Sequence, residues 1–251
     1  MEQKNNCAGR VKWVLANALH QDGKKPIKEI WREVLFDAEE YTPDDFEIIK
    51  LIETLRNETK LIGVKAQKLG LPENLYKPYV EKTLKALDVT NINSAWDNYK
   101  HFVTSDILVC FAFCAYLIDE NEIEIDDEEI NNIHAALKEL REELSKNIED
   151  PLLANFIENQ IAIISKALAE YNIKGSSALN NGFASGLTEI VEHEKTIKEN
   201  LKSSPVNKVE KAWGLFQKAT QKAAKVNKTS DTWQKIIGKG TELIEYISNI
   251  S

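Results

Sequence analysis

The densest group of side chains that could hold a metal ion surrounds His193. Glu192 and Glu194 flank this histidine, and Glu189 comes one helical turn before it. Imidazole and carboxylate groups placed in this way can bind a divalent metal or raise the pKa of the imidazole. A metal site needs a second set of ligands, and none of the four histidines has the Glu-x-x-His spacing of di-iron helices or belongs to a His-Glu-x-x-His motif. We therefore interpret the group as a solvated helix surface and predict no metal site.

An acidic stretch at residues 119–129 has the composition of a calcium-binding loop. Aligned with an EF-hand, it places Ile123 at the fifth position, Glu124 where a glycine makes the turn, and Ile130 where the bidentate glutamate belongs. These three mismatches exclude an EF-hand. The stretch is better explained as an acidic loop followed by an acidic helix start, which suits the helix dipole.

The stretch KGSSALNNGFASGL at residues 174–187 is rich in glycine and serine. It follows a helical pattern instead of a strand, lacks the Gly-Lys-Ser/Thr of a P-loop, and does not match the Gly-x-Ser-x-Gly nucleophile elbow. We expect Gly175 to end one helix and Ser176 or Ser177 to cap the next. Binding of a phosphate at that helix start, beside Lys174, is the weaker alternative.

Two of the three cysteines, Cys110 and Cys114, lie in the apolar run ILVCFAFCAYLI. Apolar surroundings raise the pKa of a thiol, and no histidine base is adjacent in the sequence, so we predict buried thiols and no nucleophile. Reduced cysteines and an N-terminus without signal-peptide features indicate a cytoplasmic protein. The sequence thus predicts no catalytic residue, no metal, no cofactor and no small-molecule ligand. An enzyme whose site forms only in three dimensions remains the alternative.

Hydrophobic side chains recur at helical spacing through most of the 251 residues, and strand-like alternation is confined to ENEIEI after Asp119. The sequence predicts an all-α, multi-helix bundle with antiparallel helix hairpins and no sheet of consequence. Its composition, 43% hydrophobic and 29% charged with a net charge of −8, is ordinary for a globular protein. We predict an N-terminal helical subdomain at 1–90, a central helical bundle at 91–202 and a C-terminal basic amphipathic hairpin at 203–251, together forming one compact unit.

Two local patterns place helices within this scheme. Thr42 before Pro43 predicts an N-cap and a proline in the first helical position. The apolar run from Ile107 to Ile118 spans about 18 Å as a helix, well short of the roughly 30 Å of a bilayer core. We therefore expect this run to be a central core helix.

Helical patterns at about residues 126–148 and 151–171 have matching apolar seams and predict an antiparallel hairpin. Gln160 lies on this seam, where a lone polar group either fixes the register or simply packs with a local hydrogen bond. Gly182 and Gly186 lie on one face of the next predicted helix. Because glycine weakens a helix, this pair indicates that another helix approaches closely.

The last quarter of the chain carries a charge opposite to that of the rest. Residues 195–240 contain 11 Lys and 3 acidic residues, a balance of +8, whereas the remaining residues have a balance of −16. At about 100° per residue, four lysines between 211 and 225 fall on one helix face, and two aromatic residues fall on the opposite face. A second amphipathic helix follows. We predict that this hairpin binds a partner through Lys211, Trp213, Phe216, Lys218, Lys222, Lys225 and Trp233.

This lysine face has four possible counterparts. In the simplest interpretation the hairpin completes the bundle and its lysines offset the acidic body of the chain. In a second interpretation the lysines bind a protein partner or a second copy of the chain. In a third they bind an anionic membrane surface, which the aromatic residues enter. Nucleic acid is disfavoured by the scarcity of arginine, with 4 Arg against 28 Lys, and by the negative net charge.

Taken together, these patterns favour a bacterial, non-enzymatic interaction protein of the accessory, immunity or phage-defence type. The lysine-rich, arginine-poor composition is the basis for the bacterial origin. We expect it to bind a protein partner through the C-terminal hairpin. A membrane-surface effector is the first alternative, and an enzyme is the second.

Overall fold

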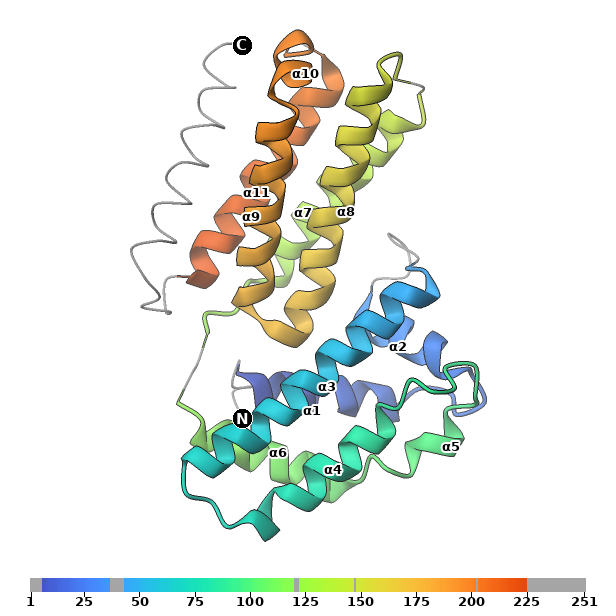
Figure 1. Ribbon diagram of the computed structural model, residues 1–251, viewed down its shortest axis with the longest axis vertical. Coiled ribbons are helices and arrows are strands. Elements are labelled where there is room, and N and C mark those ends of the chain that lie inside the picture. Colours follow the sequence, from blue (N-terminus) through green and yellow to red (C-terminus); the bar gives the residue numbers. More distant parts are fainter. Residues whose placement is uncertain (1–5, 37–42, 120–121, 147, 202, 225–251) are drawn as a thin grey trace. The chain divides into compact units, whose positions relative to one another are not determined.

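The computed structural model describes residues 6–36, 43–119, 122–146, 148–201 and 203–224. Within these residues the secondary structure is helical, with an isolated bridge between Pro26 and Ala95 in place of any sheet. This confirms the predicted all-α fold. The chain forms two compact units (Figure 1): unit 1 comprises residues 1–122 and 169–175, and unit 2 comprises residues 123–168 and 176–251.

Unit 1 is built around α1, which packs against three other helices of this unit, α2, α3 and α6. Its elements are α1 (Cys7–Leu19), α2 (Ile27–Leu35), α3 (Asp45–Lys68), the 3-10 turn η1 (Glu73–Leu75), α4 (Lys77–Ala86), α5 (Asp97–Lys100) and α6 (Ser105–Leu117). Trp31 and Trp96 are fully buried and meet edge to face, with ring centroids 5.5 Å apart. The predicted boundary near residue 90 falls inside this unit.

Asn6 links the start of α1 to the end of α6. Its Oδ1 accepts a hydrogen bond from the backbone N–H of Gly9 at 3.1 Å, which caps α1. Its Nδ2 donates to the carbonyl oxygens of Ala115 and Ile118, at 2.9 and 3.1 Å. One buried side chain therefore satisfies backbone groups at the ends of two helices, which fixes α1 and α6 in register.

Arg10 joins α1 to three other segments of unit 1. Its Nε donates to the carbonyl of Ile173 at 2.9 Å, and its guanidinium lies 3.4 Å from Glu122 and 3.7 Å from Glu58. Burial raises the pKa of Glu58, and the charge of Arg10 opposes this shift. Gly175 has a φ of +65°, as expected for a helix end, and a Cβ there would collide with Arg10 and Glu122.

Helix α3 begins later than Thr42 and Pro43 suggest. Asp44 is its N-cap, with its carboxylate accepting from the N–H of Glu47 at 2.8 Å and the side chain of Glu47 accepting from the N–H of Asp44 at 3.2 Å. The predicted cap at Thr42 is therefore wrong. A reciprocal capping box satisfies two backbone donors, and this advantage outweighs the preference for proline at the first position.

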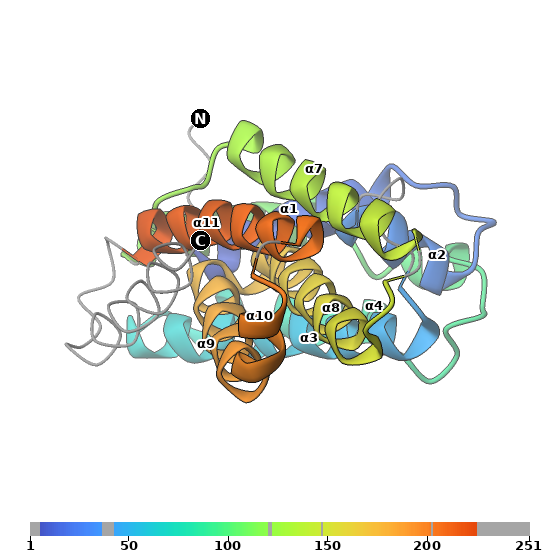
Figure 2. The ribbon, with the colours of Figure 1, turned by 90° about the horizontal axis from the view of Figure 1, so that it is seen from above.

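The described part of unit 2 contains four long helices and one short one. They are α7 (Asp127–Leu144), α8 (Pro151–Lys174), α9 (Ser176–Glu192), α10 (Glu194–Glu199) and α11 (Ser204–Ala224). As predicted, α7 and α8 form a hairpin (Figures 1 and 2), and Arg141 donates to Ser165 across it at 2.9 Å. The last six residues of α8 belong to unit 1.

Helix α11 packs between α7 and α9, as Figure 2 shows. Residues 203–224 thus belong to unit 2. The close helix approach predicted from Gly182 and Gly186 is confirmed. A Cβ on Gly182 would lie 2.5 Å from the Cβ of Ala167, and one on Gly186 would lie 2.0 Å from the ring of Trp213.

Candidate interaction surfaces

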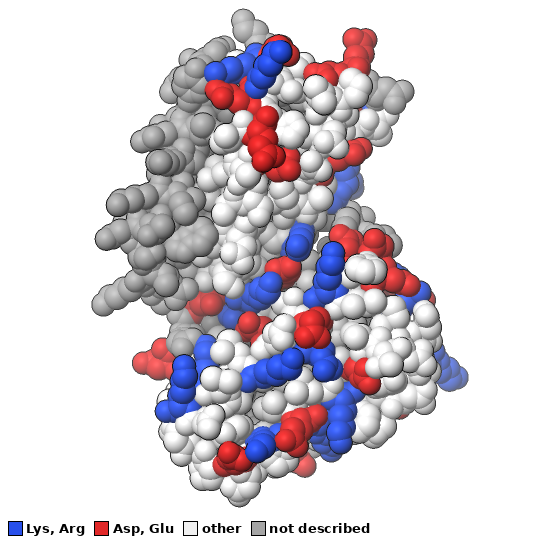
Figure 3. Space-filling view, in the orientation of Figure 1, with Lys and Arg blue, Asp and Glu red and all other residues white. Residues whose placement is uncertain are grey.

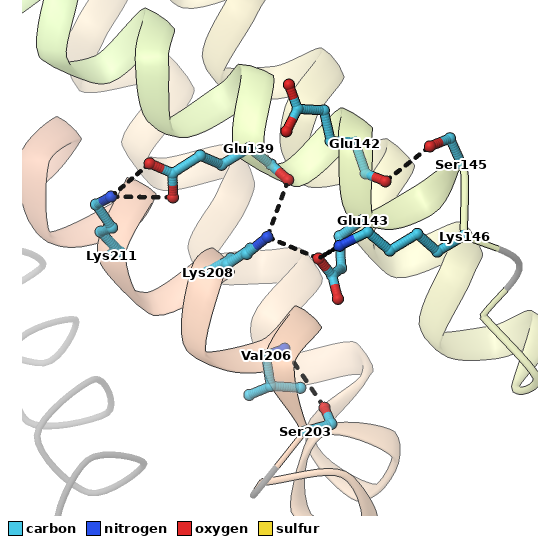
Figure 4. Close-up of polar contacts among 9 residues, drawn as sticks. All are labelled: Glu139, Glu142, Glu143, Ser145, Lys146, Ser203, Val206, Lys208 and Lys211. Carbon is cyan, nitrogen blue, oxygen red and sulfur yellow. Dashed lines mark hydrogen bonds and ion pairs between the residues drawn. The ribbon is translucent and has the colours of Figure 1, made fainter.

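The lysines of α11 face a row of carboxylates on α7. Lys211 Nζ lies 2.7 and 3.0 Å from the two carboxylate oxygens of Glu139 (Figure 4). About three turns further along α11, and at the other end of α7, Lys222 Nζ lies 2.7 Å from both Asp126 and Glu129. These ion pairs place the positive charge of α11 against acidic residues of the same unit.

Lys208 completes this row, although the sequence did not single it out. Its Nζ lies 2.6 Å from Glu143, which also pairs with Lys146 at 3.0 Å (Figure 4). The hydrogen bond from Lys208, followed by that from Lys146, lowers the pKa of Glu143 to about 2. Glu143 correspondingly raises the pKa of Lys208. The sequence did contain a signal for these ion pairs. Lys208 and Lys211 are three residues apart, Glu139 and Glu143 are four apart, and residues at these spacings lie on the same helix face.

Trp213 and Phe216 lie inside unit 2. They are 1% and 0% exposed, and their rings meet at 82° with centroids 5.5 Å apart. Trp213 Nε1 donates to Gln160 Oε1 at 2.7 Å, so the polar residue predicted on the α8 seam is buried and bonded across helices. These aromatic side chains stabilise the bundle and are not available at its surface.

The predicted partner surface on α11 therefore needs correction at four positions. Trp213 and Phe216 are core residues, and Lys211 and Lys222 are engaged by acidic residues of α7. The interpretation in which the lysines offset the acidic body of the chain is the one that these pairs support. Lys218 is exposed. The two remaining residues, Lys225 and Trp233, lie outside the described residues.

A second surface was not anticipated from the sequence. Val109, Phe113 and Tyr116 of α6 are 68%, 51% and 71% exposed. With about 100° per residue, they fall within about 60° of one another on the helix, and we call this set the α6 stripe. Helix α6 packs against α1, α3 and α4 on its other sides. We expected α6 to be a central core helix. This is correct for the face on which Ile107 and Phe111 are buried, and it is wrong for the opposite face, which is exposed.

The α6 stripe is large enough to be functional. Large apolar side chains offer about 150–250 Å² each, so their exposed fractions leave roughly 350 Å² in one patch, comparable with the largest patch on a typical monomer. Two exposed carboxylates bracket it, Asp106 in the first turn of α6 and Asp119 just after the helix. Neither forms an ion pair with another described residue.

The charged residues elsewhere on unit 1 are mixed in sign. Figure 3 shows lysine, arginine and acidic side chains interspersed over α3 and α4. Such a face carries no broad field of one sign that would attract a polyanion. The clearest departure from an ordinary charged surface in unit 1 is the apolar α6 stripe.

The contacts of the His193 side chain are with residues of unit 2. His193 Nδ1 lies 3.1 Å from the carbonyl oxygen of Glu189 and 3.5 Å from its carboxylate, and the imidazole packs against Phe156. Within the described residues, no three His, Cys, Asp or Glu side chains come together in a way that could hold a metal ion. The imidazole is thus positioned by local contacts.

All three cysteines lie in the described residues, and none is part of a disulfide. Cys110 Sγ donates to the carbonyl of Leu75 at 3.3 Å. Interaction with Cys114, together with burial, raises the pKa of Cys110, as expected for an inert thiol. The pKa of Cys114 is lowered, in contrast to our expectation, because its interaction with Cys110 outweighs the effect of burial.

One polar cleft of about 360 Å³ lies at the end of unit 2, where the α7–α8 turn meets the start of α11. Asp150, one of the three acidic residues that line it, accepts from the N–H of Leu152 at 2.9 Å and from Asn200 at 3.3 Å, and so caps α8. Ser203 caps α11 by accepting from Val206 (Figure 4). Their polar atoms therefore already serve as helix caps.

Among the described helices, none has the length and apolar content needed to cross a bilayer. Comparison of the chain with protein-family models, with curated proteins and with solved structures finds no match in any of the three.

Proposed function

We propose that this protein is a non-enzymatic helical interaction protein that binds a protein partner through the α6 stripe. The observation that carries the proposal is the exposure of Val109, Phe113 and Tyr116 together on one face of α6. Scattered exposed apolar residues are normal, whereas a contiguous patch of large ones marks an interaction site.

The α6 stripe has the composition of an interface centre. Aromatic residues are enriched in the anchoring positions of protein interfaces, and Phe113 and Tyr116 supply two such side chains one turn apart. Helix α6 is also firmly held, because its C-terminal carbonyls bond to Asn6 and its opposite face is buried. A rigid helix loses little conformational entropy when a partner binds.

The α11 lysines are less suited to this role in the folded protein. A partner that used Lys211 or Lys222 would have to displace Glu139, Asp126 or Glu129 from short ion pairs. Exchanging one ion pair for another yields little net free energy at an exposed surface. The proposal therefore keeps the predicted class of function and moves the contact surface from the hairpin to α6.

The proposal is tested by affinity capture from the native cells with the full-length chain as bait. The test variant carries Val109→Ser and Phe113→Ser, and the matched control carries Leu152→Ser and Val191→Ser, two exposed apolar positions in unit 2. We expect a protein retained by wild type and control and lost with the α6 variant, while circular dichroism shows all three folded. Equal retention by all three chains would contradict the proposal.

A further inference from the structure

We infer that the occupant of the α6 stripe is a basic amphipathic helix of the partner protein, with apolar residues that cover the stripe and lysine or arginine side chains at both ends. This inference rests on the proposed function and adds the chemistry of the partner. It is carried by the two exposed carboxylates that bracket the stripe, Asp106 and Asp119.

The shape of the site favours a helix as the ligand. Val109, Phe113 and Tyr116 follow one line along α6, with a separation of four and then three residues. A helix that presents apolar side chains at the same spacing can lie along this line, as amphipathic helices do when they dock on an apolar helix face. The contact is narrow, since roughly 350 Å² on one side is well below the about 800 Å² per partner of a standard interface. We therefore expect weak, reversible binding.

The charges of Asp106 and Asp119 determine which residues are favoured at the two ends of the partner helix. Asp106 and the last residue of α6, Leu117, are 11 residues apart, which corresponds to about 17 Å at the rise of an α-helix, and Asp119 follows two residues later. A partner helix with basic residues about 13 positions apart can place one near each carboxylate. Charged residues at the rim of an apolar contact act mainly on partner choice and association rate, so they select a basic partner over an acidic one.

The two carboxylates are not equivalent. Asp106 lies in the first turn of α6, where the positive end of the helix dipole partly offsets its charge. Asp119 follows the C-terminal end, where the dipole is negative and adds to the carboxylate. We therefore expect Asp119 to contribute more than Asp106 to the preference for a basic partner.

The same charges argue against a second copy of this chain as the occupant. An antiparallel pairing of two α6 helices, with Val109 opposite Tyr116, would bring Asp106 of one copy toward Asp119 of the other. A parallel pairing would bring like residues together. Asp106 and Asp119 likewise repel an anionic membrane surface.

The test uses two synthetic 18-residue helical peptides that share one apolar stripe and differ only at their ends. One carries lysines at both ends and the other carries glutamates. Binding to the full-length protein is measured by fluorescence anisotropy at low salt and at high salt. We expect the lysine peptide to bind at least about tenfold more tightly at low salt, and this preference to shrink at high salt as the charges are screened.

Four variants and one control locate the binding. Phe113→Ser should weaken binding of the lysine peptide about tenfold or more, while the control Val191→Ser should leave its affinity unchanged. Asp119→Lys should reduce the preference for lysine ends more than Asp106→Lys, and the double variant should favour the glutamate peptide. Each variant is checked by circular dichroism, and the charge variants serve as the test if Phe113→Ser does not fold.

Several results would overturn the inference. One is equal binding of both peptides, and another is an equal loss of peptide binding with Phe113→Ser and Val191→Ser. The others are dimerisation of the wild type, or its co-sedimentation with anionic vesicles, that Phe113→Ser abolishes. If the peptides show no preference but affinity capture still depends on α6, the charge inference fails and the proposed function stands. If capture is also independent of α6, both fail.

Discussion

The indole of Trp213 donates its hydrogen bond to Gln160 in the core of unit 2, at 2.7 Å. Gln160 Nε2 is also buried, without a hydrogen-bond partner among the described residues. The indole is therefore the side-chain partner that offsets the burial of this amide. Because the pair joins α8 to α11, it selects the register between these two helices, as a single polar residue does in a coiled coil.

The Trp213→Phe variant should lower the free energy of unfolding by about 1–3 kcal/mol, because Gln160 is then buried without the indole donor. The measurement is urea denaturation followed by circular dichroism. Combining Trp213→Phe with Gln160→Leu should recover part of this loss, since an apolar pair leaves no polar atom unpaired. Trp13→Phe, at an exposed tryptophan of unit 1, is the matched control and should change stability little. A double variant less stable than Trp213→Phe would contradict this role.

Two glycines of unit 2 should respond to alanine in opposite directions. A Cβ at Gly186 would lie 2.0 Å from the ring of Trp213, whereas one at Gly214 in α11 would meet no atom within 4 Å. Gly186→Ala should therefore destabilise the protein by about 1–3 kcal/mol through overpacking. Gly214→Ala should stabilise it by up to about 1 kcal/mol through helix propensity. Thermal unfolding of both variants tests the packing of α9 on α11, and equal shifts would refute it.

The contact between α7 and α11 should weaken in acid. The pKa of Glu143 is lowered from 4.5 to about 2 in the folded protein, chiefly by Lys208. Its contribution to stability is therefore present above pH 4.5 and is lost as the pH falls toward 2. Denaturation at a series of pH values should show wild type more stable than Glu143→Gln at neutral pH and the difference shrinking in acid. The exposed control Glu192→Gln should follow wild type throughout. A difference independent of pH would exclude Glu143 as the acid-sensitive group.

Arg10 should be among the most sensitive positions of unit 1. Replacement by methionine removes the donor to Ile173 and leaves Glu58 and Glu122 without their guanidinium partner. Breaking a buried ion pair on one side costs about 3–5 kcal/mol. The exposed control Lys24→Met should cost less than about 0.5 kcal/mol. Comparable urea midpoints for both variants would show that Arg10 does not hold these segments together.

Much of the fold follows from local pattern. Helical periodicity predicted the α7–α8 hairpin and the helix end at Gly175, because both depend on residues close together in the sequence. The close approach at Gly186 was also predictable, since glycine in a helix weakens it unless a neighbour needs the space. The start of α3 was misplaced because Asp44 and Thr42 are both good caps, and the reciprocal bond with Glu47 decides between them.

The surfaces were less predictable for a physical reason. Periodicity tells which residues share a helix face, but it does not tell what that face contacts. Lys211 and Glu139 are 72 residues apart, and their pairing depends on how α11 packs on α7. Helix α6 is apolar around its whole circumference, so its sequence carries no sign of which side is exposed. Burial of Trp213 and exposure of Tyr116 are both consequences of tertiary packing.

The central claim, that α6 and not the α11 lysine face meets the partner, is tested most directly by photo-crosslinking in the native cells. A benzophenone amino acid replaces Tyr116 in one chain and the exposed Lys218 in another. We predict a covalent adduct of one partner protein from position 116, lost when Phe113→Ser is added, and no such adduct from position 218. An adduct formed from position 218 and absent from position 116 would contradict it.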